Sequence, residues 1–326
     1  MSIKMNKNTN LNLSAAVIGT VFVDCKGFSR DRYNPAGRNL GFVQFVHGGV
    51  GRNVAENLAR MGVPVRFLSS VDDSGLGLEV LDRLAAAGAG TEYVARAESR
   101  GMGMWLAILD ERGDLAGSIS QMPDLTLMEQ MIARQGEELV KTSTHLLLEL
   151  DLNETIAKTA LSLAGTYGKP VYGVPGNLEV VSAHPEMLSQ LSCFICNHIE
   201  AERLIGIPVH ALDEIRQKDV LFSFLDKSGL QSLVVTLGAD GSVYADAASG
   251  DFGRQAACPV NVRDTSGAGD AFFSGTAMGL MRGLPLKDAV VCGTKTAGWT
   301  IESPENNCLE LGRLMKEDPV LLSLLG

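Results

Sequence analysis

A short glycine-rich segment near the C-terminal end of the chain carries the residues best suited to catalysis. The segment Arg263–Gly275 places small residues ahead of a helical pattern. The backbone N–H groups of Gly267, Ala268 and Gly269 would then lie at a helix N-terminus, where unpaired donors and the helix dipole favour an anion. Asp270 follows in the first turn, so its carboxylate could accept a proton from a substrate hydroxyl while the amides hold a phosphoryl group. The simpler interpretation makes Asp270 a helix cap.

A second glycine-rich segment lies near the N-terminal end. It runs from His47 to Ala59 and again leads from a turn into a helical pattern. Its dinucleotide fingerprint is incomplete because Val54 stands where Gly or Ala is required, which disfavours an NAD-dependent oxidoreductase. The chain contains no G-x-x-x-x-G-K-[ST] segment, so a P-loop nucleotide hydrolase is excluded. Taken alone, the segment could be a tight turn followed by a solvated Asn53.

Cysteine and histidine show no pattern of a disulfide framework or a zinc site. The six cysteines are scattered, and one C-x-x-C, at Cys193 and Cys196, encloses apolar residues typical of a buried strand. We interpret both cysteines as reduced core thiols. The five histidines have no metal-ligand spacing.

Short apolar runs alternate with amphipathic segments along most of the chain, and these elements must position the two glycine-rich segments. The alternation predicts an α/β fold with a central, mostly parallel sheet covered by helices on both faces. Since no linker or repeat interrupts the pattern, we expect residues 1–326 to form a single domain. The apolar runs lie at 15–18, 65–68, 146–148, 171–172, 193–195 and 233–237.

Two insertions break this rhythm. Residues 28–47 are polar and then alternate, and residues 91–122 contain three predicted strands with no helix between them. These strands lie around Tyr93–Ala95, Met104–Leu109 and Leu115–Ser120. We expect the two insertions to form a small β-sheet that covers the site as a lid.

Charge and the N-terminal residues restrict the class of partner. The chain has 28 basic and 38 acidic residues, a net charge of −10, which argues against a nucleic-acid or anionic-membrane surface. The apolar stretch Leu13–Val23 is too short for a membrane span, so we interpret it as a first buried strand after a loose tail at residues 1–12. We expect a cytoplasmic protein with neither a membrane nor a nucleic-acid partner.

Together, the two glycine-rich segments resemble the signatures of the ribokinase-like (PfkB) carbohydrate kinase family. Gly48–Asn53 matches its G-G-x-G-x-N element and Asp264–Asp270 its D-T-x-G-A-G-D element, in the family's order. Three landmarks also match: Asp24, Asn197–Glu200 as N-x-x-E, and Thr236–Gly241 as T-L-G-x-x-G. The resemblance implies a ribokinase-like three-layer α/β/α domain with a small lid, and a kinase that uses ATP.

The resemblance also assigns roles to individual residues. It makes Asp270 the base that activates the accepting hydroxyl, with an anion hole at the three amides before it. It places Glu149 near substrate or phosphate, although Glu149 could equally be a surface charge at a strand end. The residues that it assigns to the sugar are Asp24, Gly48, Gly49 and Asn53.

The same resemblance implies that ATP and Mg²⁺ are required. It assigns Mg²⁺ indirectly to Glu200, and a possible K⁺ ion to backbone oxygens of Asp264 and Ser266. The residues that it assigns to the nucleotide are Asn197, Thr236, Gly238, Gly241 and Thr265.

Within the family, the chain is most similar to the pseudouridine kinase branch. Val50 and Arg52 replace the Lys and Ala that ribokinases typically carry, and Tyr33–Gly37 and Asn306–Asn307 also fit this branch. Val174 departs from the polar residue that relatives commonly place before Pro175. Apolar contacts to a nucleoside base would come from the lid, with candidates Phe42, Phe45 and either Met104 or Trp105, although each could equally pack within the small sheet.

We therefore expect ATP-dependent phosphorylation of a ribosyl hydroxyl, with pseudouridine as the leading substrate. Ribokinase or another sugar or nucleoside kinase is the alternative within the family. A sensor that binds nucleoside without turnover is the alternative of another class, although a pure binder would need no base at Asp270. Family members often dimerise through the lid, so a homodimer is possible.

Overall fold

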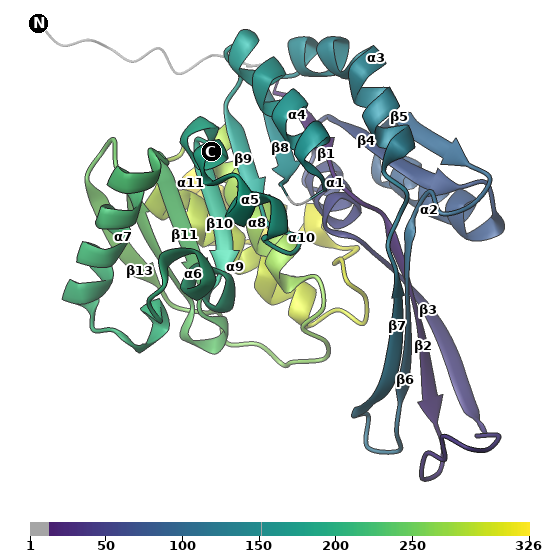
Figure 1. Ribbon diagram of the computed structural model, residues 1–326. Helices are drawn as coiled ribbons and strands as arrows, with labels where there is room; N and C mark the ends of the chain where they lie inside the picture. The colour runs from purple at the N-terminus through teal and green to yellow at the C-terminus, as the bar shows by residue number, and fades with distance from the viewer. Residues whose placement is uncertain (1–12, 151) are drawn as a thin grey trace, which may run out of the picture.

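The computed structural model describes residues 13–150 and 152–326, so the loose tail expected at residues 1–12 lies outside the described residues. A large sheet of nine strands forms the centre (Figure 1), in the order β13, β12, β11, β10, β9, β8, β1, β4, β5. All neighbouring strands are parallel except β12 and β13, which confirms the mostly parallel sheet. The strands are β1 (Ala15–Ile18), β4 (Val65–Asp72), β5 (Ala89–Ala97), β8 (His145–Glu149), β9 (Val171–Val174), β10 (Cys193–Asn197), β11 (Ser232–Thr236), β12 (Ser242–Asp246) and β13 (Asp251–Gln255).

Helices cover both faces of this sheet and complete the predicted three layers. Side chains alternate along a strand, so in β1 Ala15 and Val17 pack into one core and Ala16 and Ile18 into the other. The first core is closed by α1 (Val50–Arg60), α2 (Gly75–Ala87), α8 (Ala268–Met281), α9 (Leu286–Ile301), α10 (Leu311–Glu317) and α11 (Pro319–Leu325). The second is closed by α3 (Thr126–Thr142), α4 (Glu154–Thr166), α5 (Glu179–Ala183), α6 (His198–Ile205) and α7 (Glu214–Ser228).

A separate four-stranded sheet projects from the large one and forms the lid (Figure 1). Its order is β3, β2, β6, β7, and β2 and β6 are parallel neighbours from different insertions. The sheet therefore joins segments far apart in the sequence, as predicted. Its strands are β2 (Phe22–Ser29), β3 (Gly41–Gly48), β6 (Gly103–Leu109) and β7 (Leu115–Gln121).

The predicted lid boundaries were partly wrong. The lid begins at Phe22, and the segment Tyr93–Ala95, expected in the lid, pairs with Leu68–Ser70 of β4 at the edge of the large sheet. The reason is the helix α2 before it, which forms a β-α-β crossover and returns the chain parallel to β4. The turn after β5 then leads into the lid.

The C-x-x-C pair behaves as core residues, as expected. Cys193 and Cys196 are buried on opposite faces of β10, one in each hydrophobic core, so they cannot share a metal ion. Burial raises the pKa of both thiols. Within residues 13–150 and 152–326, no helix is both long and apolar enough to cross a membrane.

Candidate active site

The predicted site residues gather where parallel strands of the large sheet end. Glu149, Asn197 and Thr236 are the last residues of β8, β10 and β11, which run in one direction. The glycine-rich segments enter α1 and α8, which pack against each other. In open α/β sheets, this carboxyl edge is where ligands bind.

Asp270 lies in the first turn of α8, half-buried. Helix α8 is preceded by Gly267, whose φ of 76° is a left-handed conformation that favours glycine. A Cβ at Gly267 would lie 2.1 Å from the Asn306 carbonyl oxygen, so only glycine lets these segments meet. From α1, the side-chain amide of Asn53 donates to Asp270 Oδ2 at 2.6 Å. The two signatures therefore meet at one carboxylate.

The surroundings of Asp270 favour a proton acceptor near neutral pH. Burial raises the pKa of Asp270 to about 6, because desolvation penalises the charged form. The hydrogen bond from Asn53 and the positive charge of Arg52 oppose this rise in pKa, whereas the charge of Glu200 adds to it. At pH 7 the carboxylate is mostly ionised, and a pKa just below the working pH suits a general base.

The amides at the start of α8 are only partly available to an anion. Ala268 N–H donates to the Thr265 carbonyl at 3.2 Å, which corrects the prediction that it faces a ligand. The N–H groups of Gly267 and Gly269 donate no hydrogen bond to any described residue. These two donors remain for an anion at the helix N-terminus.

The loop before α8 is held by Asp264. Its Oδ1 accepts from Ser266 N–H at 2.8 Å, and its Oδ2 pairs with Lys26 of the lid at 3.8 Å. The K⁺ site expected at backbone oxygens of Asp264 and Ser266 stays a prediction.

The predicted sugar-binding residues lie on the lid side of Asp270. Asp24, on β2, is half-buried, and no described residue donates a hydrogen bond to its carboxylate. A Cβ at Gly48 would lie 3.4 Å from Asp24 Oδ2 and 3.7 Å from Asn306 Nδ2, so both side chains lie next to Gly48. Asn306 Oδ1 is buried and has no donor among the described residues. The half-buried Asp24 carboxylate is thus an acceptor for a ligand hydroxyl, whereas Asn306 Oδ1 is buried from solvent.

Gly49 has a structural task next to this space. It caps the N-terminus of α1 with a φ of 94°, and a Cβ there would lie 2.6 Å from the Thr20 carbonyl oxygen. The residue lets the turn pack against the end of β1. Its assignment to the sugar stays a prediction.

Glu149 is neither a surface charge nor a free ligand. It is 7% exposed, and its Oε2 accepts from the backbone N–H groups of Thr20 at 2.7 Å and Gly51 at 3.2 Å. The Thr20 hydroxyl donates to the same carboxylate. Burial raises the pKa of Glu149 to about 7 despite these bonds, and the charge of Asp270 adds to the rise. Glu149 therefore fastens the start of α1 to β1 behind Asp270.

The N-x-x-E element forms a capping box at α6. The Asn197 side chain accepts from the N–H of Glu200 at 2.9 Å, and Glu200 Oε2 accepts from the N–H of Asn197 at 2.8 Å. The sequence pattern thus has a structural reason besides any role toward nucleotide. Glu200 nevertheless lies close enough to raise the pKa of Asp270.

The T-L-G-x-x-G segment forms the turn between β11 and β12. Gly241 has a φ of 84°, and a Cβ there would lie 2.0 Å from the Gln255 carbonyl oxygen. Gly238 is also left-handed, with open space at its Cβ position. Thr236 ends β11, while Thr265 is exposed beside the start of α8. The nucleotide assignments of these residues stay predictions.

The register of the lid separates the four predicted base contacts. We call the face that carries Asp24 and Lys26 the inner face, because Lys26 pairs with Asp264 at the site. Trp105 is aligned with Asp24, and Phe42 lies further along the same face. Phe45 alternates to the opposite face, which corrects its prediction as a base contact. Of the alternatives Met104 and Trp105, only Trp105 lies on the inner face.

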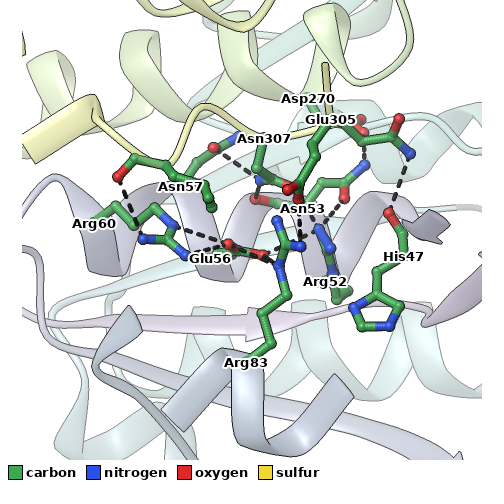
Figure 2. A network of polar contacts seen from close by, with 12 residues as sticks. His47, Arg52, Asn53, Glu56, Asn57, Arg60, Arg83, Asp270, Glu305 and Asn307 are labelled. Atoms are coloured by element: carbon green, nitrogen blue, oxygen red, sulfur yellow. Dashed lines mark hydrogen bonds and ion pairs between the residues drawn. The ribbon is translucent and has the colours of Figure 1, made fainter. Parts of the chain in front are cut away.

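A buried polar network lies directly beneath the site (Figure 2). Arg52 and Glu56, on α1, are 1% and 0% exposed, with Arg52 Nη1 3.2 Å from Glu56 Oε2. Arg52 Nη1 also donates to Asn53 Oδ1 at 2.7 Å and to Asn307 Oδ1. Sequence reasoning gave these contacts no role. The adjacent Asn306–Asn307 pair was the one available signal, as a branch resemblance.

Other regions offer no rival centre. A hollow of about 690 Å³ between α5, α6 and α7 contains none of the predicted site residues. Across the part of the chain that the structure describes, no three His, Cys, Asp or Glu side chains are grouped to hold a metal ion. Asp270 therefore stays the predicted centre of the chemistry.

Comparisons with known proteins show what the whole chain is similar to. The family model "pfkB family carbohydrate kinase" matches residues 12–310. A guanosine-inosine kinase of Exiguobacterium acetylicum is 38% identical over 89% of this chain and 95% of its own. The pseudouridine kinase of Escherichia coli is 27% identical over 84% and 86%. The structure of Arabidopsis thaliana ribokinase complexed with ribose and ATP has the same fold, with a TM-score of 0.79 at 20% identity, covering 96% and 98%.

The pKa of Asp270 predicts the acid side of the pH profile. Activity that needs the carboxylate should be complete above about pH 7 and should fall as the pH drops through about 6, because protonation removes the base. Steady-state kcat/KM between pH 5 and 8.5 measures this. Glu149, whose pKa burial raises to about 7, titrates within the same pH range, so Glu149→Gln shows how much of the fall in activity belongs to that group. A profile flat down to pH 5 would contradict the assignment.

Proposed function

Because the chain belongs to the pfkB family of carbohydrate kinases, we propose that it transfers the γ-phosphoryl group of ATP to the 5′-hydroxyl of a ribonucleoside. The observation that carries this proposal is the hydrogen bond between Asn53 and Asp270, which joins the two signatures at one carboxylate beside free amides. This arrangement combines a proton acceptor with an anion site.

The chemistry needs one proton transfer and one bond exchange. Asp270 accepts the proton of the 5′-hydroxyl while the 5′-oxygen of the nucleoside bonds to the γ-phosphorus of ATP. The bond between that phosphorus and the oxygen bridging to the β-phosphate breaks, and ADP leaves. The N–H groups of Gly267 and Gly269 would stabilise the negative charge on the transferred group.

The remaining predicted residues are the ones that we assign to Mg²⁺ and ATP. Mg²⁺ typically binds one or two carboxylates together with phosphate oxygens and water, so it needs no cluster of three acidic residues. We assign Glu200 to this ion through water, and Asn197, Thr236, Gly238, Gly241 and Thr265 to ATP. K⁺ would lie at the backbone oxygens of Asp264 and Ser266.

The Asp24 carboxylate next to Gly48 supports a ribose ring. No described residue donates a hydrogen bond to it, and the 2′- and 3′-hydroxyls of ribose are adjacent donors. Trp105 lies beside Asp24 on the inner face of the lid and offers apolar surface to a base. A free sugar would leave this aromatic surface uncovered, which favours a nucleoside.

Two nucleoside classes are candidates. The 38% identity to a guanosine-inosine kinase favours guanosine or inosine, and the lower 27% identity to a pseudouridine kinase makes pseudouridine the second candidate despite its motif resemblance. All three bases carry a ring N–H next to a carbonyl group. We therefore expect a substrate with this lactam edge.

The outer face of the lid supports a homodimer. Phe45, Leu106 and Ile119 form a row across the strands and are 52%, 41% and 69% exposed, with Val43 beside them at 65%. An apolar sheet face of this kind is unfavourable in water. A second copy can cover it by twofold symmetry, since the same patch then serves both sides. We propose that two lids associate through this face.

Replacing the base should abolish turnover and spare binding. We expect Asp270→Asn to lower kcat by about 10²–10⁴-fold while ATP still binds, because the amide keeps the shape but accepts no proton. ADP release and calorimetric titration measure the two properties. Asp288→Asn is the matched control, as Asp288 occupies the first turn of the neighbouring helix α9. Wild-type turnover by the Asp270 variant would show that another group is the base.

A substrate panel tests the nucleoside proposal. We expect guanosine, inosine or pseudouridine to exceed ribose and fructose by at least about tenfold in kcat/KM with MgATP, and ³¹P NMR to show a 5′-phosphate. Adenosine, whose base lacks the lactam edge, and uridine, whose base has it, are included to test recognition of the base. Ribose as the better substrate would refute the nucleoside proposal, and no turnover with any acceptor would favour the non-catalytic sensor.

A charge on the outer lid face should separate the dimer. We expect Ile119→Glu to convert a dimer into a monomer in sedimentation at micromolar concentration, because a buried unpaired carboxylate is strongly unfavourable. Leu322→Glu on α11 is the control, since Leu322 is 53% exposed and remote from the lid. A monomeric wild-type chain would contradict the dimer.

A further inference from the structure

We propose that Arg52 is a positioning residue, whose buried guanidinium orients the Asn53 amide so that its NH₂ group faces Asp270. The role rests on the proposed kinase function, in which Asp270 is the base. Arg52 itself touches neither reacting atom in this proposal. It acts through Asn53 and through its charge.

The geometry fixes the amide in one orientation. Arg52 Nη1 donates to Asn53 Oδ1 at 2.7 Å, and Asn53 Nδ2 donates to Asp270 Oδ2 at 2.6 Å. An amide has an acceptor end and a donor end. If it turned over, its oxygen would face the Asp270 carboxylate and its NH₂ would face the guanidinium, creating two repulsive contacts. The cation therefore selects the orientation that supports an ionised Asp270.

The Arg52 guanidinium is itself held by an ion pair with Glu56. Glu56, fully buried, lies one helical turn from Arg52 and also accepts from Arg60 Nε at 2.8 Å and Arg83 Nε at 3.0 Å (Figure 2). Burial opposes ionisation of Glu56, but these arginines outweigh it and hold its pKa below the usual value. Glu56 thus supplies a fixed negative charge under Arg52.

Burying this ion pair is costly for folding, so its position calls for a reason. Desolvation of two charges often cancels their attraction, and such pairs can be replaced by apolar residues without loss of stability. Burial lowers the pKa of Arg52 to about 10, so it is still a cation at neutral pH. Orientation of the site is a gain that apolar residues could not provide.

Arg52 also contacts the loop between α9 and α10. Arg52 donates to Asn307 Oδ1, and Asn307 Nδ2 donates to Asn57 Oδ1 at 2.9 Å and to the Asn53 carbonyl at 3.0 Å. The neighbouring Glu305 pairs with Arg83. This loop also carries the Asn306 carbonyl that packs on the backbone before α8. Arg52 therefore ties both sides of the Asp270 environment to α1.

The charged groups around Asp270 make this role measurable. Arg52 opposes the effect of burial on the pKa of Asp270, Glu200 adds to that effect, and Glu149 is coupled from behind. Arg60 contributes to Glu56 but is not among the charges that shift Asp270. Removing Arg52 should therefore shift the titration of Asp270, and removing Arg60 should not.

The test uses the full chain with Arg52→Gln and Glu56→Gln together, so that neither member of the fully buried pair is left charged without the other. Arg60 and Arg83, which also pair with Glu56, are partly exposed, and Arg83 keeps Glu305. We expect the Asp270 carboxyl, followed by ¹³C NMR and assigned with Asp270→Asn, to titrate at a higher pH than in the wild type. We expect kcat to fall by about 10–100-fold, as for a misplaced catalytic group, with KM for ATP unchanged. Arg52→Lys should keep the titration near the wild-type pH, because the charge remains, yet still lose kcat.

Arg60→Gln is the matched control, expected to leave the Asp270 titration unchanged. An unshifted titration and a kcat within about twofold of the wild type in the folded double variant would overturn the positioning role. The NMR titration needs no substrate. If the wild type phosphorylates no nucleoside, the proposed function fails while the effect of Arg52 on Asp270 is still measured.

Discussion

Two opposite charges, Arg52 and Glu56, lie one helical turn apart inside the protein with almost no exposed surface. A guanidinium in this position must use its hydrogen bonds inside the protein, because water cannot supply partners. It uses them on Asn53 and Asn307, which belong to segments at opposite ends of the chain. Removing one partner of such a pair typically costs about 3–5 kcal/mol, because the other charge is then buried without compensation. The hydrogen bonds to Asn53 and Asn307, not the ion pair, join the two segments.

The sheet topology supplies the rest of the arrangement. Parallel strands bring their carboxyl ends to one edge, where Glu149 fastens α1 to β1 through Thr20 and Gly51. The helix that carries Asp270 starts at this edge and packs on α1. The lid projects from the same edge, and its inner face lies toward the loop that precedes Asp270. Asp270, whose pKa is raised to about 6, thus shares one region with the free N–H groups of Gly267 and Gly269 and the Asp24 carboxylate.

The sequence was sufficient for the α/β fold and the lid, because strand periodicity and turns are local patterns. The roles of the two signatures came from the family resemblance, and only the structure shows that Asn53 contacts Asp270. The sequence did not predict the contacts of Arg52, since a buried arginine depends on partners far away in the chain. It misplaced Phe45, because the face of a lid strand follows from a register set by neighbours. Ala268 was expected to face an anion, but the tightness of the turn at Thr265 engages its N–H.

A crystal structure of the chain with guanosine and a non-hydrolysable ATP analogue tests the central claim most directly. If Asp270 is the general base, the ribose 5′-oxygen should lie within about 2.6–3.2 Å of an Asp270 carboxylate oxygen. We also expect the Asn53 NH₂ group on that carboxylate and its oxygen on Arg52. A nucleoside that presents another hydroxyl to Asp270, or binds away from it, would contradict the account.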